Sequence, residues 1–294
     1  MPHDLLVAML AGLGGMLGWG TADFFAKKTI DKIGDVTTLF WGQLIGIFPL
    51  IVLIIAYHPH TPTHSHDTLK VILLGVYSGL SYIPAYIAFG KGKLSLLSPI
   101  FASYAAIVAL ISASVFHEQL TNMQQLAIVI VFCGILLVST NPLDLFKLLK
   151  GHSRHKTDGL NYILVATVSY SFWLIALDRF LNGRNWVPFL LGIRVFSAIT
   201  LFLYAVLSGR KLFIRGHKMW KYLIGIGVFD VFAFASVSYG FSATPHTAIV
   251  TVLAATFSIP TIILARTFLN ERVSPLQALA SITILAGIVL LSVS

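Results

Sequence analysis

Apolar stretches of about twenty residues recur along the whole chain, and they constrain its fold more than any other feature. A helix needs about 20 apolar residues to cross a bilayer, whereas a transmembrane strand needs about ten residues of alternating polarity. The stretches here do not alternate, as VILLGVYSGL from residue 71 illustrates. The sequence therefore predicts an all-α membrane protein with ten transmembrane helices. They are expected at roughly 5–26, 36–57, 69–90, 94–116, 122–140, 159–178, 186–208, 219–240, 245–268 and 274–293.

The composition excludes a water-soluble enzyme. Hydrophobic residues make up 57% of the 294 residues and charged residues only 11%, whereas soluble chains average about 25% charged. The chain has a net charge of +9. Its basic residues lie between the apolar stretches and form no basic stripe with interleaved aromatic residues, so no nucleic-acid partner is expected. The chain has no nucleotide-binding, zinc-protease or nucleophilic-serine motif. We therefore expect no enzymatic activity and no cofactor.

Metal and disulfide chemistry are not expected either. Cys133 is the single cysteine and lies inside an apolar stretch, which excludes an intrachain disulfide and a cysteine-based metal cluster. Four His lie between residues 58 and 67, but the two Pro among them and their irregular spacing favour a solvated loop over a metal site.

The second half of the chain repeats the first. Residues 118–139 align without gaps with residues 271–292 at a constant shift of 153. Matched Leu and Ala are expected by chance in lipid-facing helices, so the informative matches are those of other residue types. They are Glu118 with Glu271, Gln124 with Gln277 and Gly134 with Gly287.

An odd number of spans in each repeat forces the two halves to insert with opposite orientation. We therefore predict two inverted five-helix repeats, at residues 1–140 and 159–294, joined by a connecting loop at 141–158. Sixteen Lys and Arg lie in connections that follow odd-numbered spans and three lie in the others, so the first face is expected to be cytoplasmic. In transporters of this architecture the substrate site lies between the halves, near the bilayer midplane.

The repeated residues resemble the EamA signature of the drug/metabolite transporter superfamily. In each half a Glu closes the fourth span, Thr or Ser and then Gln follow at intervals of three, and a Gly stands near the end of the fifth span. The Trp19-Gly20 pair and Arg194 also resemble the family's pattern. The resemblance implies ten-helix carriers that export or exchange amino acids, nucleotide sugars and other small metabolites. Two positions depart from it: Asp23 stands where a neutral polar residue is commoner, and Gln43 stands where the second half has Arg194.

Two charged residues lie deep inside predicted spans. Arg194 is about eight residues into its span, and Asp230 is near the centre of the following one. Ionisable groups inside a membrane usually face the protein interior or a water-filled cavity. One interpretation is that both bind substrate, Arg194 as a bidentate partner for an anion and Asp230 as the group that couples transport to protons. The alternative is a static ion pair between them.

Three other acidic residues are expected to have structural roles. Asp23 precedes Lys27 by four residues near the end of the first span, which predicts an ordinary ion pair on one helix face. Glu118 and Glu271 are expected to accept hydrogen bonds from backbone N–H groups at the start of the next helix.

Aromatic and hydroxyl side chains supply the other candidates for a substrate site. Tyr82 and Tyr86 lie four residues apart on one face of a helix. With Trp19 and Trp173 they offer ring faces to an amphiphilic or cationic solute. Thr251 lies on the polar face of the ninth span. The alternative is that the aromatic residues pack helices together or anchor them at the interface, and that the Thr hydroxyl bonds within its own helix or to a neighbour.

These features predict a secondary transporter, an exporter or exchanger that moves a small polar or amphiphilic metabolite, such as an amino acid, by alternating access. The small-molecule substrate, the lipid bilayer and the proton as coupling ion are its expected partners, and the sequence does not specify the oligomeric state. The alternative is a non-transporting membrane binding protein or a subunit of a complex. Short loops and the lack of a cleavable targeting segment are typical of a bacterial inner (plasma) membrane.

Overall fold

The protein is described by a computed structural model at residues 3–57, 65–115, 121–139, 158–181, 186–214, 216–244, 250 and 253–293. Apart from a 3-10 turn, η1 (His217–Met219), the elements of this part of the chain are α-helices. They are α1 (His3–Ile33), α2 (Asp35–Tyr57), α3 (Ser65–Lys91), α4 (Leu94–Ala102), α5 (Tyr104–Val115), α6 (Asn122–Ser139), α8 (Leu160–Leu181), α9 (Trp186–Leu207), α10 (Trp220–Ala243), α12 (Ser258–Phe268) and α13 (Pro275–Val293).

In the described ranges, six helices are long and apolar enough to cross a membrane: α1, α2, α3, α8, α9 and the stretch that comprises η1 and most of α10. Shorter apolar helices occupy the other four predicted spans. They are Leu94–Val108, Asn122–Gly134, Leu253–Phe268 and Ala278–Leu290. The all-helical prediction is confirmed for the residues described, whereas the number of ten membrane spans stays a prediction.

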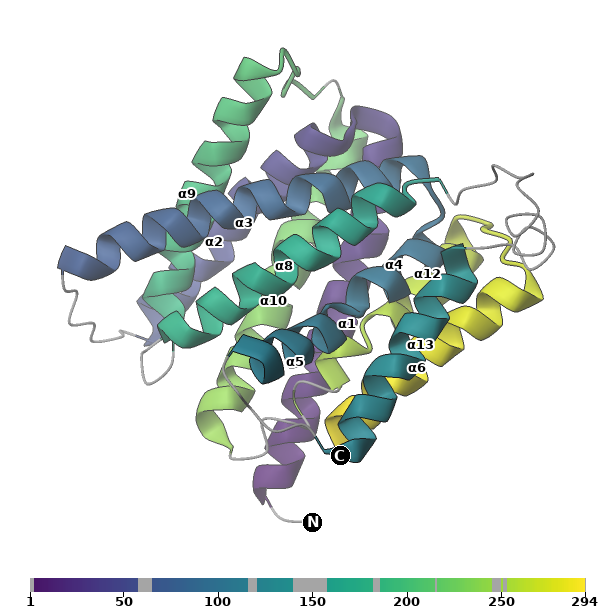
Figure 1. The fold of residues 1–294 in the computed structure, drawn as a ribbon. Coiled ribbons are helices and arrows are strands. Elements are labelled where there is room, and N and C mark those ends of the chain that lie inside the picture. Colours follow the sequence, from purple (N-terminus) through teal and green to yellow (C-terminus); the bar gives the residue numbers. More distant parts are fainter. Residues whose placement is uncertain are drawn as a thin grey trace.

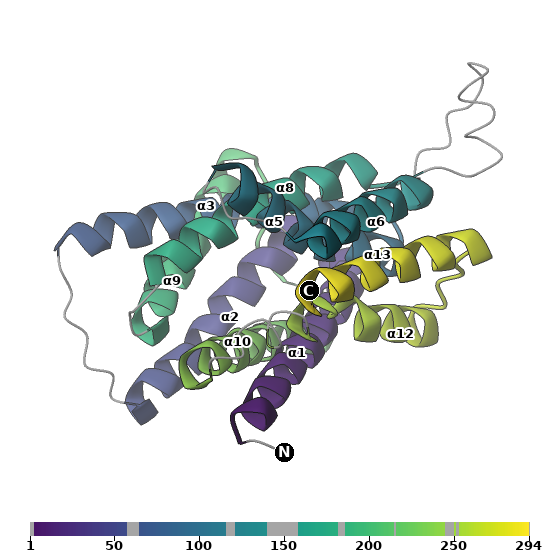
Figure 2. The same cartoon turned by 60° about the horizontal axis from the view of Figure 1, so that its bottom comes forward.

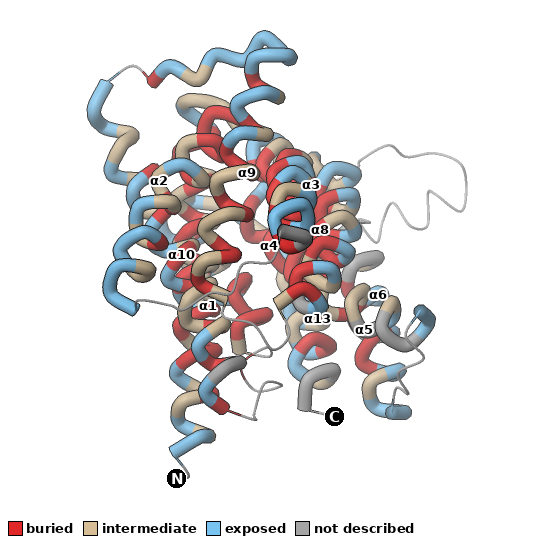
Figure 3. The backbone as a smooth tube through the Cα atoms, turned by 90° about the vertical axis from the view of Figure 1, so that its left-hand side faces the viewer, coloured by how far each residue is buried: buried red, intermediate tan, exposed pale blue. Residues whose placement is uncertain are grey.

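The outer surface of the helix assembly is apolar. Buried residues lie where helices meet, and exposed residues cover the outer faces and the ends (Figure 3). Many of the exposed side chains are large and hydrophobic, for example Phe48, Phe202 and Ile282, which are 71%, 49% and 62% exposed. A protein in water rarely leaves such a surface uncovered, whereas lipid chains cover it at no cost.

Helices from the two halves of the chain pack against each other in matched pairs (Figures 1 and 2). Helix α1 packs on α10, and its counterpart α8 packs on α3; α2 likewise contacts α10, and its counterpart α9 contacts α3. Two further contacts join a helix to its own counterpart, α2 with α9 and α6 with α13, and α4 of the first half also packs on α12 of the second. This pattern is the one expected when two repeats are related by a pseudo-two-fold axis.

The fourth helical stretch of each half is broken at the same place. Helix α4 ends before Ser103, whose hydroxyl donates to the carbonyl of Ile100 at 2.5 Å. In the second half the hydroxyl of Thr256 donates to the carbonyl of Leu253 at 2.7 Å. The shift of 153 relates Ser103 to Thr256 and Ile100 to Leu253. Hydroxyl groups that bond a preceding carbonyl compete with the regular helix ladder, so the sequence repeat here encodes a repeated interruption.

Glu271 joins the two halves at the start of α4. Its carboxylate accepts hydrogen bonds from the backbone N–H of Leu94 and of Ser95, both at 2.9 Å, and from the Ser95 hydroxyl at 2.6 Å. Lys93 donates to the carbonyl of Arg272 beside this cap. The expected capping role is therefore present, but the expected helix was wrong. Glu271 caps a helix of the other half and not the helix that follows it.

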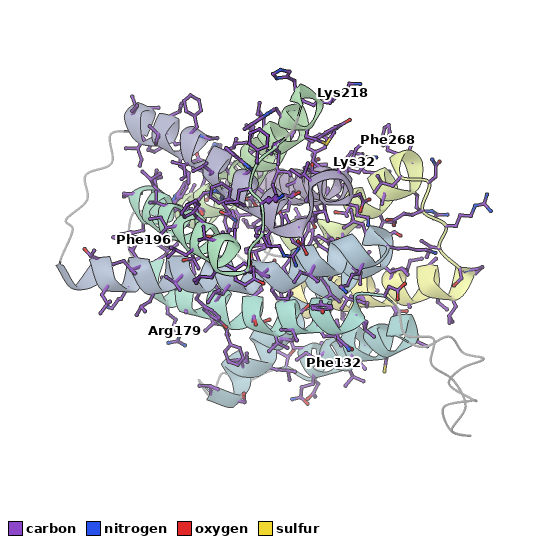
Figure 4. All side chains as sticks on the ribbon, turned by 90° about the horizontal axis from the view of Figure 1, so that it is seen from above. Lys32, Phe132, Arg179, Phe196, Lys218 and Phe268 are labelled. Carbon is purple, nitrogen blue, oxygen red and sulfur yellow. The ribbon has the colours of Figure 1, made fainter. Side chains whose placement is uncertain are left out.

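The described residues of the connections after odd-numbered helical stretches lie on one side of the molecule. Besides the contact between residues 93 and 272, Arg210 forms an ion pair with Asp35 at 3.3 Å, which joins the connection after α9 to the start of α2. Figure 4 labels Lys32 and Lys218 in one region of the molecule and Arg179, from an even-numbered connection, away from them. This arrangement supports the predicted basic face.

Glycines let α6 and α13 approach closely, in a reciprocal way. A Cβ atom at Gly134 would lie 2.6 Å from Cγ1 of Ile284, and one at Gly287 would lie 2.7 Å from Cγ2 of Val131. The shift of 153 relates Gly134 to Gly287 and Val131 to Ile284. Each helix thus presents a glycine to the branched side chain of the other, as expected for close helix packing in a membrane.

We expect Gly287→Val to lower the free energy of unfolding by about 1–3 kcal/mol, because the new side chain overpacks against Val131. Gly134→Val should have a similar effect, because its contacts are the counterparts of those of Gly287. Thermal unfolding in detergent measures both. Ala286→Val is the matched control, since Ala286 is the adjacent residue and is exposed. An equal loss of stability in the Ala286 variant would contradict this account of the interface.

Candidate functional site

A cavity lies between the two halves of the chain, and it is called the central cavity below. About 610 Å³ of unfilled space, including its opening to solvent, lies within it. Helices α1 to α5 supply one part of its wall, and α8, α9, α10 and the segment before α12 supply the other. The lining residues are Trp19, Ala22, Asp23, Gly42, Gln43, Tyr82, Ala85, Tyr86, Phe89, Phe101, Tyr104, Tyr170, Arg194, Ile226, Asp230 and Phe257.

An ion pair between Arg194 of α9 and Asp230 of α10 forms part of this wall. The guanidinium Nη2 lies 2.5 Å from Oδ2 of Asp230, and the two side chains are 8% and 17% exposed. Nε of Arg194 also donates to the carbonyl of Gln43 in α2 at 3.3 Å. Burial makes each charge dependent on the other, because an uncompensated charge away from water is costly. The pair is the arrangement that one interpretation of the sequence expected.

Gly46 of α2 provides the space that the Arg194 side chain occupies. A Cβ atom at this position would collide with Nε of Arg194 and would lie 2.5 and 2.6 Å from its Nη2 and Cζ. The glycine follows Gln43 by one helical turn, so the same face of α2 both accepts a hydrogen bond from the guanidinium and leaves room for it. From the sequence, a Gly that stands four residues after another Gly, as Gly46 does, predicts only close helix packing. Its relation to Arg194 is not predicted.

Asp23 lines the central cavity and does not pair with Lys27, so the expected surface ion pair was wrong. Nζ of Lys27 lies 3.1 Å from Oδ1 of Asp31 and donates to the carbonyl of Phe89 at 2.6 Å. Both partners draw the lysine away from Asp23 and toward the end of α1. Oδ2 of Asp23 is buried and has no hydrogen-bond partner among the described residues.

Aromatic rings form most of the rest of the cavity wall. Tyr170 of α8 lies at their centre, with ring centroids 5.3 Å from Tyr82, 5.3 Å from Phe101 and 5.0 Å from Tyr104. Tyr170 was missed by sequence reasoning, because one tyrosine in an apolar span has no pattern that distinguishes it. The edge-to-face and tilted contacts hold these rings in fixed orientations, which favours a preformed site over a collapsed one.

A second, smaller cavity shares part of this wall. About 400 Å³ of unfilled space lies within it, and its lining includes Gln43, Tyr82 and Arg194, which also line the central cavity. Trp173 lines only the second cavity, where its indole N–H donates to the carbonyl of Leu74 at 3.0 Å. The three shared side chains therefore stand between the two cavities.

The structure brings five of the predicted site residues to one cavity and places another beside it. Trp19, Tyr82, Tyr86, Arg194 and Asp230 line the central cavity, and Trp173 lines the second. Predictions that fall outside the described residues are those for Thr251, for Glu118 and for the histidines of the 58–64 segment. Within the described ranges no three His, Cys, Asp or Glu side chains gather at one place.

The fold and the cavity define an integral membrane protein of two homologous helical repeats with a polar and aromatic site between them. Both repeats match the EamA-like transporter family, at residues 6–140 and 158–293, and the chain belongs to that family.

The chain is also similar to two further proteins. An uncharacterized protein of Methanocaldococcus jannaschii is 28% identical over 132 residues, which are 45% of this chain and 96% of that protein. Its length thus corresponds to about half of this chain. A crystal structure is similar with a TM-score of 0.69 at 15% identity, covering 96% of this chain and 95% of that one, which supports the fold alone.

Gly46→Ala is expected to destabilise the protein by about 1–3 kcal/mol, because the added methyl group displaces the Arg194 guanidinium from Asp230. In a background that carries Arg194→Ala and Asp230→Asn, the same change should cost much less, since the colliding group is gone. Thermal unfolding of the four proteins in detergent measures the difference. Equal costs in both backgrounds would show that Gly46 does not act through the arginine.

Proposed function

We propose that this protein is a secondary transporter that exports or exchanges a small polar or amphiphilic metabolite, such as an amino acid, by alternating access. The observation that carries the proposal is the central cavity, whose wall is built by both repeats and contains charged and aromatic side chains. Inverted repeats that rock against each other expose such a cavity to each side of the membrane in turn. A bacterial inner membrane is the proposed location.

The Arg194–Asp230 pair is the proposed element that responds to the solute. Its groups lie 2.5 Å apart on two α-helices of the second half that are consecutive in the sequence, and the carbonyl of Gln43 in the first half also contacts Arg194. A solute anion that binds the guanidinium, or a proton that binds the carboxylate of Asp230, would break the ion pair and weaken the link between α9 and α10. Binding would thereby change the relative energies of the outward and inward states, which is what coupling requires.

Removing the pair one charge at a time separates its structural role from its role in transport. Asp230→Asn or Arg194→Gln alone should lower stability by about 3–5 kcal/mol, because each leaves one buried charge unpaired. The double variant should regain most of that stability, since both charges are gone. Concentrative transport should be lost in all three.

Thermal unfolding and uptake into proteoliposomes, measured on the same preparations, test this expectation. Asp35→Asn is the matched control, because it removes one partner of the more exposed Asp35–Arg210 pair and should cost less than about 1 kcal/mol. Full transport by the double variant would reduce the Arg194–Asp230 pair to a static link between helices.

Flux distinguishes a carrier from a membrane binding protein or complex subunit, because all of these bind solutes. Proteoliposomes loaded with unlabelled neutral, basic or acidic amino acids should take up the matching labelled compound by counterflow for at least one class. Liposomes that contain the Arg194→Gln/Asp230→Asn variant are the control for leakage. Binding of a solute without counterflow, in protein that unfolds cooperatively, would favour the non-transporting alternative.

A further inference from the structure

The charges of the central cavity do not cancel. Arg194 and Asp230 neutralise each other at 2.5 Å, which leaves Asp23 as an additional acidic side chain in the wall. The two lysines that follow Asp23 on α1 have other partners: Lys27 has Asp31 and a carbonyl, and Lys28 lies 5.1 Å from the ring centroid of Tyr222. When both carboxyl groups are ionised, the cavity therefore carries one net negative charge.

Asp23 is also unsatisfied in its hydrogen bonds. Among the described residues, its Oδ2 is buried without a donor, and the indole N–H of Trp19, one helical turn earlier, is buried without an acceptor. Native proteins leave few buried polar atoms unpaired, and such atoms in a cavity wall indicate a partner that comes from outside the protein. For a carboxylate oxygen that partner is a donor, and the negative charge favours a cationic one.

The rings around Asp23 suit an organic cation better than a hydrated metal ion. Trp19 lies on the same helix, Tyr86 lines the same cavity from α3, and Phe257 lines it from the segment before α12. The negative face of an aromatic ring attracts an ammonium group within about 6 Å of its centroid, most strongly where water is excluded. The same rings also accept the hydrocarbon part of an amine, whereas Mg²⁺ and Ca²⁺ are held chiefly by carboxylates, and one of the two carboxylates in this wall is already paired with Arg194.

We infer that the central cavity binds an organic ammonium compound, with Asp23 as the partner of its nitrogen and the Trp19 and Tyr86 rings beside it. The inference rests on the proposed transport function and narrows its substrate class to amines with one net positive charge. A substrate carboxylate would have to displace Asp230 from Arg194, whereas an ammonium group can bind Asp23 without displacing a described partner. Monovalent amines should therefore bind more tightly than zwitterions or anions of the same size.

The inference is tested with three probes that share a phenyl ring and differ in the end group of a short side chain. They are 2-phenylethylammonium, 2-phenylethanol and phenylacetate, whose end groups are cationic, neutral and anionic. We expect only the ammonium compound to raise the melting temperature of the purified protein at millimolar concentration, since ligands that bind the folded state stabilise it. In Asp23→Asn this rise should disappear, and in Asp23→Glu it should persist. Asp4→Asn on the same helix is the matched control and should respond like the unmodified protein, because Asp4 is exposed and lies outside the cavity.

The outcomes separate this inference from the proposed transport function. A rise in melting temperature that is equal in Asp23→Asn, equal for all three probes, or absent for the ammonium compound in the unmodified protein would overturn the inference. Asp23→Glu, which keeps the charge, guards against a general loss of folding in Asp23→Asn. Counterflow of 2-phenylethylammonium tests transport separately. Binding that depends on Asp23 without any counterflow would contradict the transport function alone, and counterflow of neutral or acidic solutes by Asp23→Asn would contradict the substrate class alone.

Discussion

A charged side chain inside a membrane protein is stable only when something nearby replaces the water that it has lost, and this constraint organises the central cavity. Helices satisfy their own backbone groups in a bilayer, but a guanidinium or carboxylate needs a partner. Arg194 and Asp230 are partners of each other, and Gly46 leaves room for the guanidinium to reach Asp230. Asp23 meets this requirement through no described side chain, and the inferred ammonium ligand would supply the missing partner.

The scaffold is symmetric, whereas the charges in it are not. The breaks at Ser103 and Thr256 and the reciprocal glycines of α6 and α13 show that both repeats use the same solutions for helix packing. The buried ion pair, in contrast, belongs entirely to the second half, and the unpaired carboxylate belongs to the first. Duplication thus supplies a symmetric arrangement of helices around the cavity. A few residues that differ between the two repeats determine which ligand charge the cavity favours.

Hydropathy predicted the helices from the sequence because the bilayer imposes length and composition on each one locally. The same local reasoning failed where a side chain had partners on other helices. Asp23 and Asp31 both stand four residues from Lys27, and the lysine, which also donates to the carbonyl of Phe89 on α3, pairs with Asp31. For the same reason, Glu271 was correctly predicted to cap a helix, but the helix was the wrong one, since its donors are 176 and 177 residues away. Arg194 and Asp230 were found because buried charge is rare enough to be noticed without knowing its partner.

The two helix breaks connect this asymmetric site to the symmetric frame. Phe101 lies just before the break at Ser103 and Tyr104 lies just after it, and both line the central cavity, as does Phe257 at the break of the second half. Under alternating access, a change of angle at either break would move rings on one side of the break relative to those on the other. The start of α4 is capped by Glu271 from the opposite half, so the helix that ends at the first break is joined at its other end to the second repeat. Under alternating access, the cap would therefore couple the shape of the cavity wall to the relative position of the two repeats.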